Sequence, residues 1–246
     1  MKRIGRILQP LYLLFVISSF VASVLIALPF FLLSGLIKHP IARIFIYQWV
    51  HYWAKMWLFL IGMPLCKKGK FPNGRKYVIV ANHISYLDTV NIYATIPSYF
   101  RTLARKEMVR IPVFGIIYKQ LTILVDRSSP ESRTKSMKLM WRLLKNECHI
   151  AIFPEGGFNE TNQLLNTFYN GAFRLAVNTQ TPILPVLFPD TQERWHYSGW
   201  WKIFPGKNRA IFLDPIAVEG LQEEALKELV YQKMETALRD YRMGKQ

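Results

Sequence analysis

A long run of apolar residues opens the chain. Residues 11–37 contain no Lys, Arg, Asp or Glu. As a helix this run would measure about 40 Å, against about 30 Å for the hydrocarbon core of a bilayer. A cleaved signal peptide is the competing interpretation, because Lys2, Arg3 and Arg6 precede the run. The apolar part of a signal peptide is usually only about 7–15 residues long, so we predict a membrane-embedded helix.

A second apolar stretch covers residues 44–64 and is interrupted by His51 and Lys55. Three tryptophans recur in it at a spacing of four, which places them on one face of a helix. That face suits the headgroup region of a membrane, and a helix that covers the globular core is the other interpretation. The tryptophans are Trp49, Trp53 and Trp57.

The orientation of these segments is not set by charge. Three basic residues precede the first segment, and Lys38 and Arg43 follow it. The positive-inside rule therefore selects no direction for a simple span. A helical hairpin that is sunk in one leaflet and kinked near Pro29 would keep both ends cytoplasmic. We keep this hairpin and a spanning helix as alternatives.

Beyond residue 67 short apolar runs alternate with amphipathic stretches, which indicates an α/β fold with a largely parallel sheet covered by helices. The expected strands are 77–81, 102–104, 121–125, 149–153, 183–188 and 210–213. The expected helices are 86–96, 107–119, 131–147, 168–179 and 221–242. We assign residues 1–64 to N-terminal membrane-anchoring helices and residues 65–246 to the α/β domain.

Charge adds a partner to this picture. The 246 residues include 32 Lys or Arg against 16 Asp or Glu, a net charge of +16, and 51% of them are hydrophobic, which excludes a disordered chain. The first 87 residues hold eleven basic residues and no acidic one. We therefore expect an anionic bilayer as partner and no nucleic acid, since no nucleic-acid-binding pattern is found. Cys66 and Cys148 lie far apart, without metal-ligand spacing.

A histidine and an aspartate follow the expected strand 77–81. His83 and Asp88 are five residues apart, and Ser85 and Asp88 have the spacing of a capping box, so we expect Ser85 to start the helix. With His83 on the loop before that helix, the carboxylate can reach the imidazole and fix its tautomer, which leaves the other ring nitrogen as a base. A capping aspartate beside an incidental histidine is the other interpretation.

Three further motifs follow in a fixed order. They are Arg105-Lys106-Glu107 with residues 111–115, then Phe153-Pro154-Glu155-Gly156, then residues 181–186. Together with His83 and Asp88, this order resembles the glycerolipid acyltransferase family, which includes the bacterial 1-acylglycerol-3-phosphate acyltransferases. The resemblance covers about residues 65–190.

The resemblance implies a role for each matching residue. His83 would be the general base, oriented by Asp88, and the acceptor hydroxyl would attack the thioester of acyl-CoA or acyl carrier protein without acylating the enzyme. Glu155 and Gly156 would belong to the acceptor site, although Glu155 holding loop amides is a rival role. Arg105 or Lys106, and Arg127, are the candidate phosphate ligands, and a solvated surface charge is the other interpretation of each. Backbone N–H groups near the start of the helix after Asn82 would stabilise the oxyanion. No cofactor or metal is expected.

The chain departs from the family pattern at two places. Gly157 and Phe158 stand where the family has a small hydroxyl residue and an arginine, and Asn170 stands where it often has lysine. Arg174 is a local substitute. These departures keep a lyso-amino-acid lipid, another lysophospholipid or a catalytically idle membrane scaffold open as alternatives. The expected function remains acyl transfer to 1-acyl-sn-glycerol-3-phosphate, giving phosphatidic acid, at the cytoplasmic side of a bacterial inner membrane.

One aromatic segment stands outside these motifs. Residues 195–204 contain five aromatic side chains and one lysine. Such a segment either inserts at the lipid interface or packs as a hairpin on the sheet.

Overall fold

A single seven-stranded sheet forms the centre of the protein. The computed structural model describes residues 2–36, 40–110, 114–126, 128–161 and 163–244. The strand order is β1-β7-β6-β2-β5-β3-β4. Neighbouring strands are parallel throughout except for β6 and β7, which are antiparallel. The expected α/β fold with a largely parallel sheet is therefore confirmed.

The strands are short and mostly buried, because both faces of the sheet are covered. Every residue of β2 and β5 is buried. Their bounds are β1 Leu65–Lys68, β2 Val78–Ala81, β3 Phe100–Arg105, β4 Thr122–Val125, β5 His149–Ile152, β6 Ile183–Leu187 and β7 Asn208–Phe212. All six expected strands are present with shifted ends, and β1 was not predicted because its residues are mostly exposed.

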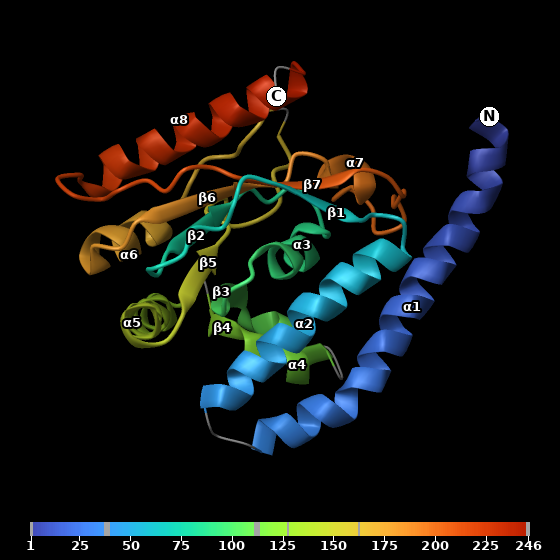
Figure 1. The fold of residues 1–246 in the computed structure, drawn as a ribbon, viewed down its shortest axis with the longest axis horizontal. Helices are drawn as coiled ribbons and strands as arrows, with labels where there is room; N and C mark the ends of the chain where they lie inside the picture. The colour runs from blue at the N-terminus through green and yellow to red at the C-terminus, as the bar shows by residue number, and fades with distance from the viewer. Residues whose placement is uncertain (1, 37–39, 111–113, 127, 162, 245–246) are drawn as a thin grey trace.

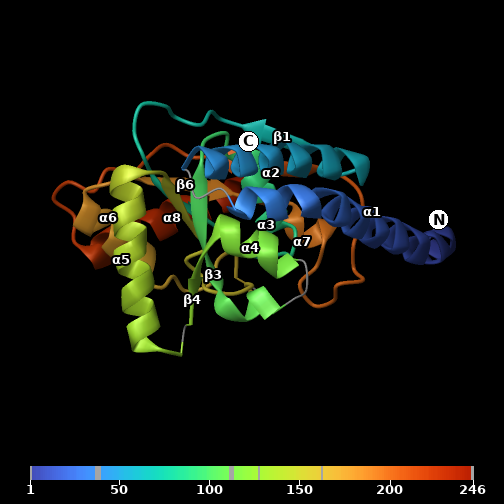
Figure 2. The ribbon, with the colours of Figure 1, turned by 90° about the horizontal axis from the view of Figure 1, so that it is seen from below.

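Helices divide into two layers, one on each side of the sheet (Figures 1 and 2). One apolar core lies between the sheet and the first layer, and a second core lies between the sheet and the other layer. The first layer holds α1 Lys2–Leu36, α2 Pro40–Leu60, α3 Asp88–Thr95 and α4 Phe114–Leu121. The second holds α5 Pro130–Asn146, α6 Gly171–Thr179 and α8 Glu223–Arg242.

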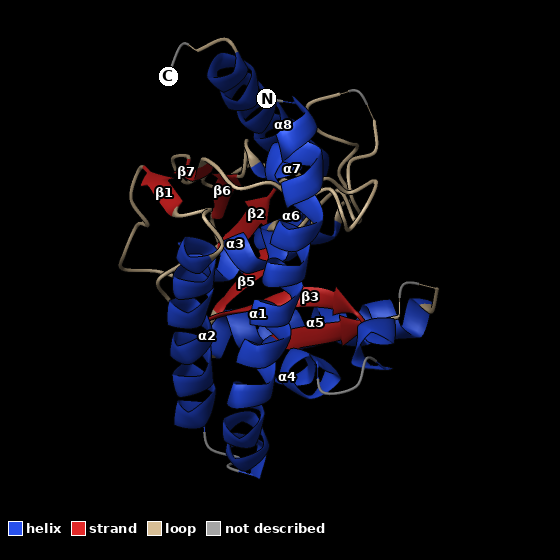
Figure 3. Ribbon diagram, turned by 90° about the vertical axis from the view of Figure 1, so that its right-hand side faces the viewer, coloured by secondary structure: helices blue, strands red, loops and turns tan. Residues whose placement is uncertain are grey.

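The two N-terminal helices form an antiparallel pair in front of the sheet (Figure 3). α1 contains Pro10 and Pro29, and it changes direction toward its C-terminal end (Figure 1). Its residues 8–33 are long and apolar enough to cross a membrane, and only 11% of the most apolar window is buried. The connection after α2 is closed by Gly62, whose φ of +72° favours glycine.

The tryptophan face of α2 points inward. Trp57 is buried, and Trp49 and Trp53 pack against the core that α2 shares with the sheet. Trp53 stacks between the other two rings. The headgroup interpretation of this face is therefore wrong, and the helix covers the globular core. The outward face of α2 instead exposes Tyr52 and Phe59.

One expected helix is divided in the structure. The stretch predicted as 107–119 comprises a 3-10 helix, η1 Lys106–Arg110, and then α4. Pro112 between them removes a backbone donor, which is why a continuous helix is unfavourable. Gly115 allows the two pieces to pack closely, because a Cβ there would lie 2.0 Å from the Val109 carbonyl oxygen.

Candidate active site

The predicted motifs meet because their strands are neighbours. β2 pairs with β5, and β5 pairs with β3, all in parallel. Their carboxyl ends therefore lie at one edge of the sheet, where open α/β folds bind ligands. His83 follows β2, Glu155 follows β5, and Arg105 ends β3. The sequence placed these residues at strand ends, and the strand order brings them together.

His83 and Asp88 are in direct contact. The Nδ1 atom of His83 lies 3.0 Å from Oδ2 of Asp88, whose side chain is fully buried. The same oxygen accepts hydrogen bonds from the backbone N–H groups of Ile84 and Ser85, at 2.6 and 2.8 Å. With the carboxylate accepting a hydrogen bond from Nδ1 of His83, Nε2 is left as the proton acceptor.

Ser85 does not start the helix as expected. α3 begins at Asp88, and the Ser85 hydroxyl accepts the Leu87 N–H and donates to the carbonyl oxygen of Trp195. Only the carboxylate half of the capping box forms, from Asp88 to the Ser85 N–H. The Asp88 carboxylate accepts the N–H groups of Ile84 and Ser85. These two amides therefore have hydrogen-bond partners without a helical turn that begins at Ser85.

The backbone N–H groups expected to stabilise an oxyanion are already bonded. Those of Ile84 and Ser85 donate to Asp88, and that of His83 donates to Glu155. This expectation is therefore wrong for these three amides. Within the described ranges, the Gly157 N–H has no hydrogen-bond partner, and Gly157 lies on the same cavity wall as His83.

Glu155 connects two loops. Its Oε1 accepts the His83 N–H at 2.7 Å, and its Oε2 accepts the Asn166 N–H at 2.8 Å. Burial raises the pKa of Glu155 from 4.5 to about 7, while the two amide bonds oppose the shift and the charge of Asp88 adds to it. The side chain is 4% exposed and does not line the cavity beside His83. The observed contacts are those of the rival role, holding loop amides.

A large apolar cavity opens at His83. Its volume is about 720 Å³, and it extends between the N-terminal helices and the sheet. α1 contributes Ala27 and Phe31, α2 contributes all three tryptophans, and β3 contributes Arg105. The tryptophan spacing placed these three side chains on one helix face, but it did not show which way that face turns.

Aromatic rings surround the imidazole. Phe153 stacks on His83 with ring centroids 4.3 Å apart, and Phe158 meets it edge to face at 4.6 Å. Tyr86 in turn contacts Phe158 at 4.8 Å. Phe158 was not predicted as a site residue, because the sequence comparison with the family pattern noted only that an arginine is missing at this position. Its position one residue after the two glycines was the available signal.

The predicted phosphate ligands are dispersed. Arg105 lines the cavity, and no ion-pair partner for it is found among the described residues. Lys106 forms an ion pair with Asp126, and Arg174 forms one with Glu223, and neither base lines the cavity. Arg127 lies outside the described residues. Gly156 lines the cavity beside His83.

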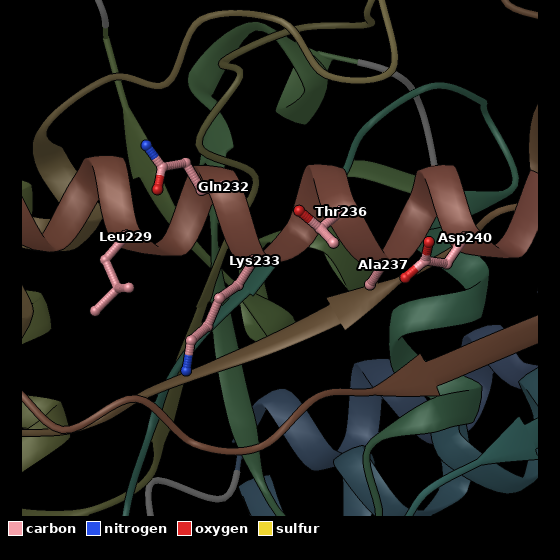
Figure 4. Close-up of a pocket in the computed structure, with 6 residues that line it drawn as sticks. All are labelled: Leu229, Gln232, Lys233, Thr236, Ala237 and Asp240. Carbon is pink, nitrogen blue, oxygen red and sulfur yellow. The ribbon is translucent and has the colours of Figure 1, made fainter.

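A second hollow, of about 290 Å³, lies on α8 (Figure 4). It is lined by residues of that helix alone and by none of the predicted site residues. Within the described ranges, no three His, Cys, Asp or Glu side chains gather where they could hold a metal ion. The cavity at His83 is therefore the candidate active site.

Comparisons with known proteins identify similar chains. The family model described as Acyltransferase matches residues 65–188. A 1-acyl-sn-glycerol-3-phosphate acyltransferase from Haemophilus influenzae is 32% identical over 157 residues, which cover 62% of each chain. An enzyme of the same name from Cocos nucifera is 28% identical over 182 residues, covering 73% of this chain and 58% of its own. This chain thus spans about three fifths of the length of these curated relatives.

A solved structure shares the whole fold. The crystal structure of the 1-acyl-sn-glycerophosphate acyltransferase PlsC from Thermotoga maritima superposes with a TM-score of 0.76 at 23% identity and covers 98% of both chains. Because this coverage includes the N-terminal helices, the α1–α2 pair belongs to the shared architecture.

Proposed function

Because the chain belongs to the acyltransferase family, we propose that it transfers a fatty acyl group from a thioester donor to the free hydroxyl of 1-acyl-sn-glycerol-3-phosphate. The observation that carries this proposal is the contact between His83 and Asp88 at the wall of a large apolar cavity. The curated relatives are named for that acceptor. Acyl-CoA or acyl carrier protein would be the donor.

The proposed reaction needs one base. Nε2 of His83 takes the proton of the acceptor hydroxyl while its oxygen attacks the thioester carbonyl carbon. The tetrahedral intermediate then collapses, the carbon–sulfur bond breaks, and the leaving thiolate takes the proton from the imidazolium. Asp88 stabilises the imidazolium through Nδ1. The Gly157 N–H and the Arg105 guanidinium are the donors that we propose for the oxyanion.

The apolar cavity supports a lipid substrate. Its wall of tryptophan, phenylalanine and alanine side chains suits an alkyl chain, at about 0.8 kcal/mol for each buried methylene. α1 exposes large apolar residues along most of its length, among them Leu14 and Ile26. We propose that α1 and the outer face of α2 lie in the membrane, with the catalytic domain on the cytoplasmic side of a bacterial inner membrane.

A second acceptor class is favoured by one observation. Among the described residues that line the cavity, Arg105 is the one Lys or Arg, and Phe158 occupies space beside His83. One cation is a weak site for a phosphate dianion, which usually takes several donors. A lysolipid without a terminal phosphate, such as a lyso-amino-acid lipid, is therefore the alternative acceptor.

The test is thiol release from acyl-CoA by the purified protein, measured with and without lysolipid acceptors. We expect His83→Ala to reduce acceptor-dependent release by about 10²–10⁴-fold, the usual contribution of a general base. Asp88→Asn should reduce it as well, because an amide does not stabilise the imidazolium. Asp214→Asn, at an exposed aspartate outside the cavity, is the matched control.

Four outcomes separate the alternatives. A His83→Ala protein with an unchanged rate would refute the general base. Thiol release that needs no acceptor would indicate a thioesterase. A panel of acceptors that compares lysophosphatidate with a lyso-amino-acid lipid decides the acceptor class. If no acceptor in the panel led to thiol release, the remaining interpretation would be a catalytically idle scaffold.

A further inference from the structure

The aromatic segment at residues 195–204 folds as a hairpin with a buried base. Trp195 and Ile203 form an antiparallel bridge, and Ile203 is fully buried. The His196 N–H donates to the Lys202 carbonyl oxygen at 3.0 Å, and the Trp195 indole donates to the Trp200 carbonyl oxygen at 2.9 Å. We call residues 195–204 the aromatic hairpin. Its base is thus fixed by the protein, so its tip has a defined direction.

The aromatic hairpin exposes large apolar rings. Trp200 and Trp201, near its tip, are 54% and 49% exposed, and Phe204, which follows the Trp195–Ile203 bridge at its base, is 45% exposed. Single exposed apolar side chains are ordinary, but three aromatic ones within five positions form a patch that usually marks an interaction surface. Tryptophan in particular favours the boundary between headgroups and acyl chains. The alternative of a hairpin packed on the sheet holds only for its base.

The tip lies beside the apolar surface of α1. The Gln9 side-chain amide donates to the Trp201 carbonyl oxygen at 3.0 Å. The neighbouring α1 residues Leu8 and Leu11 are 54% and 62% exposed. In Figures 1 and 2 the segment that follows α7 (Thr191–Arg194) lies next to the N-terminal half of α1. Two apolar surfaces from distant parts of the chain are therefore adjacent.

The charge of the aromatic hairpin and of the three residues that follow it indicates the kind of partner. Residues 195–207 contain Lys202 and Lys207 and no acidic residue, and both lysines are exposed. Aromatic rings flanked by basic side chains match an anionic lipid surface, because lysine and arginine near the headgroups are attracted to anionic lipids.

The aromatic hairpin also touches the active site. The Ser85 hydroxyl donates to the Trp195 carbonyl oxygen, and Ser85 and His196 form a backbone bridge. The Trp195 side chain lines the catalytic cavity. An element that contacts both lipid and the loop of His83 can orient the cavity mouth.

We propose that the aromatic hairpin is a second membrane contact, which inserts Trp200, Trp201 and Phe204 among the headgroups of an anionic bilayer beside α1 and holds the cavity mouth at the lipid surface. This inference rests on the proposed function, because it takes the bilayer as the source of the acceptor. Added to the contact of α1 and the outer face of α2, this contact brings the element that touches the Ser85 loop to the lipid surface.

The first test uses the full chain with vesicles that contain phosphatidylglycerol and brominated phosphatidylcholine, whose bromine atoms quench nearby tryptophan. We expect the double variant Trp200→Ser with Trp201→Ser to lose a quenched part of the emission. Trp141→Ser is the matched control, because Trp141 is also exposed, at 42%, but lies on α5 and is covered by Lys145. The emission that the Trp141→Ser variant loses should not be quenched by the brominated lipid. Equal quenching of the lost emission in both variants would overturn the proposal.

The second test separates this inference from the proposed function. With an acceptor embedded in the same vesicles, we expect the double variant to lose about tenfold in kcat/KM, since the lost aromatic area weakens lipid contact. With short-chain substrates dissolved in water, its rate should equal that of the wild type. No transfer by the wild type with either substrate would refute the function while the quenching test still stands. A dimer that the double variant abolishes, with quenching unchanged, would assign the tip to a second copy and refute the lipid contact.

Discussion

At the scale of single residues, the site depends on two carboxylates with different tasks. Asp88 binds the imidazole of His83 and the amides of its loop, while Glu155 binds the amide of His83 and that of Asn166. The imidazole is therefore held at its ring and at its backbone. The loop that carries His83 has little freedom, which favours a fixed position of Nε2.

The raised pKa of Glu155 makes stability depend on pH. The folded protein keeps the proton on Glu155 up to about pH 7, whereas the unfolded chain releases it near 4.5. The stability contributed by this group is fully present below pH 4.5 and is lost as the pH rises through 7. The loss is up to ~3 kcal/mol in the free energy of unfolding, an order-of-magnitude value from about 1.4 kcal/mol per pKa unit.

Glu155→Gln should remove this dependence. The free energy of unfolding of the wild type should fall relative to that of the variant between pH 4.5 and 7.5, as measured by denaturant titration at each pH. The variant should also be less stable at low pH, since its amide group faces a backbone N–H donor. Glu160→Gln, at an exposed residue of the same loop, is the control and should follow the wild type. Parallel curves for Glu155→Gln and the wild type would contradict the raised pKa.

At the scale of elements, α1 and α2 form one wall of the active site. Ala27 of α1 is 3% exposed and lines the cavity together with the tryptophans of α2. The helix that we propose as an anchor therefore also forms a wall of this cavity. The room inside the cavity is set in part by side chains of the apolar segment at residues 11–37.

Ala27→Phe should shorten the acyl chain that the protein accepts. The added ring occupies space inside the cavity, and excluding two methylenes at about 0.8 kcal/mol each corresponds to about a tenfold loss in kcat/KM for the longest donor. Short donors should be unaffected. Rates with a series of acyl-CoA chain lengths measure this. Ala22→Phe adds the same ring to the exposed face of α1 and should leave the chain-length profile unchanged. If Ala22→Phe also shifted the preferred chain length, the effect of Ala27→Phe would not come from the cavity.

At the scale of the whole molecule, the N-terminal helices and the α/β domain share a core. Val16 and Phe31 of α1 are buried in the same cluster as Ile79 of β2. The Tyr12 hydroxyl donates to the Ile61 carbonyl oxygen at 2.6 Å, and the Gln120 amide donates to that of Phe31 at 2.9 Å. The division at residue 64 stays a prediction, and the packing across it is continuous.

Removal of residues 2–36 should therefore destabilise the remainder. Two large side chains, each worth about 1.5–3 kcal/mol when buried, are lost together with the hydrogen bonds, so the free energy of unfolding in detergent should fall by at least about 3 kcal/mol. Acyl transfer should be absent even with water-soluble substrates, because a cavity wall is missing. A shortened protein of unchanged stability and unchanged rate on soluble substrates would show that α1 is an anchor only.

The sequence by itself determined the local features of this protein. The strand periodicity gave six of the seven strands, and the spacing of His83 and Asp88 predicted a contact that the structure contains at 3.0 Å. Both depend on short-range geometry, because alternation and a five-residue loop restrict where side chains can point. The apolar run at residues 11–37 likewise follows from composition alone.

Only the tertiary structure decided which way surfaces face and which strand ends meet. The tryptophans of α2 point to the cavity, Glu155 binds the amide of His83, and Phe158 covers the imidazole. Each of these contacts joins segments that are distant in the chain or turns an amphipathic face toward one of two apolar environments. A hydrophobic pattern in the sequence does not distinguish a protein core from a lipid bilayer, because both are apolar. Which of the two environments a helix face contacts is therefore decided by packing.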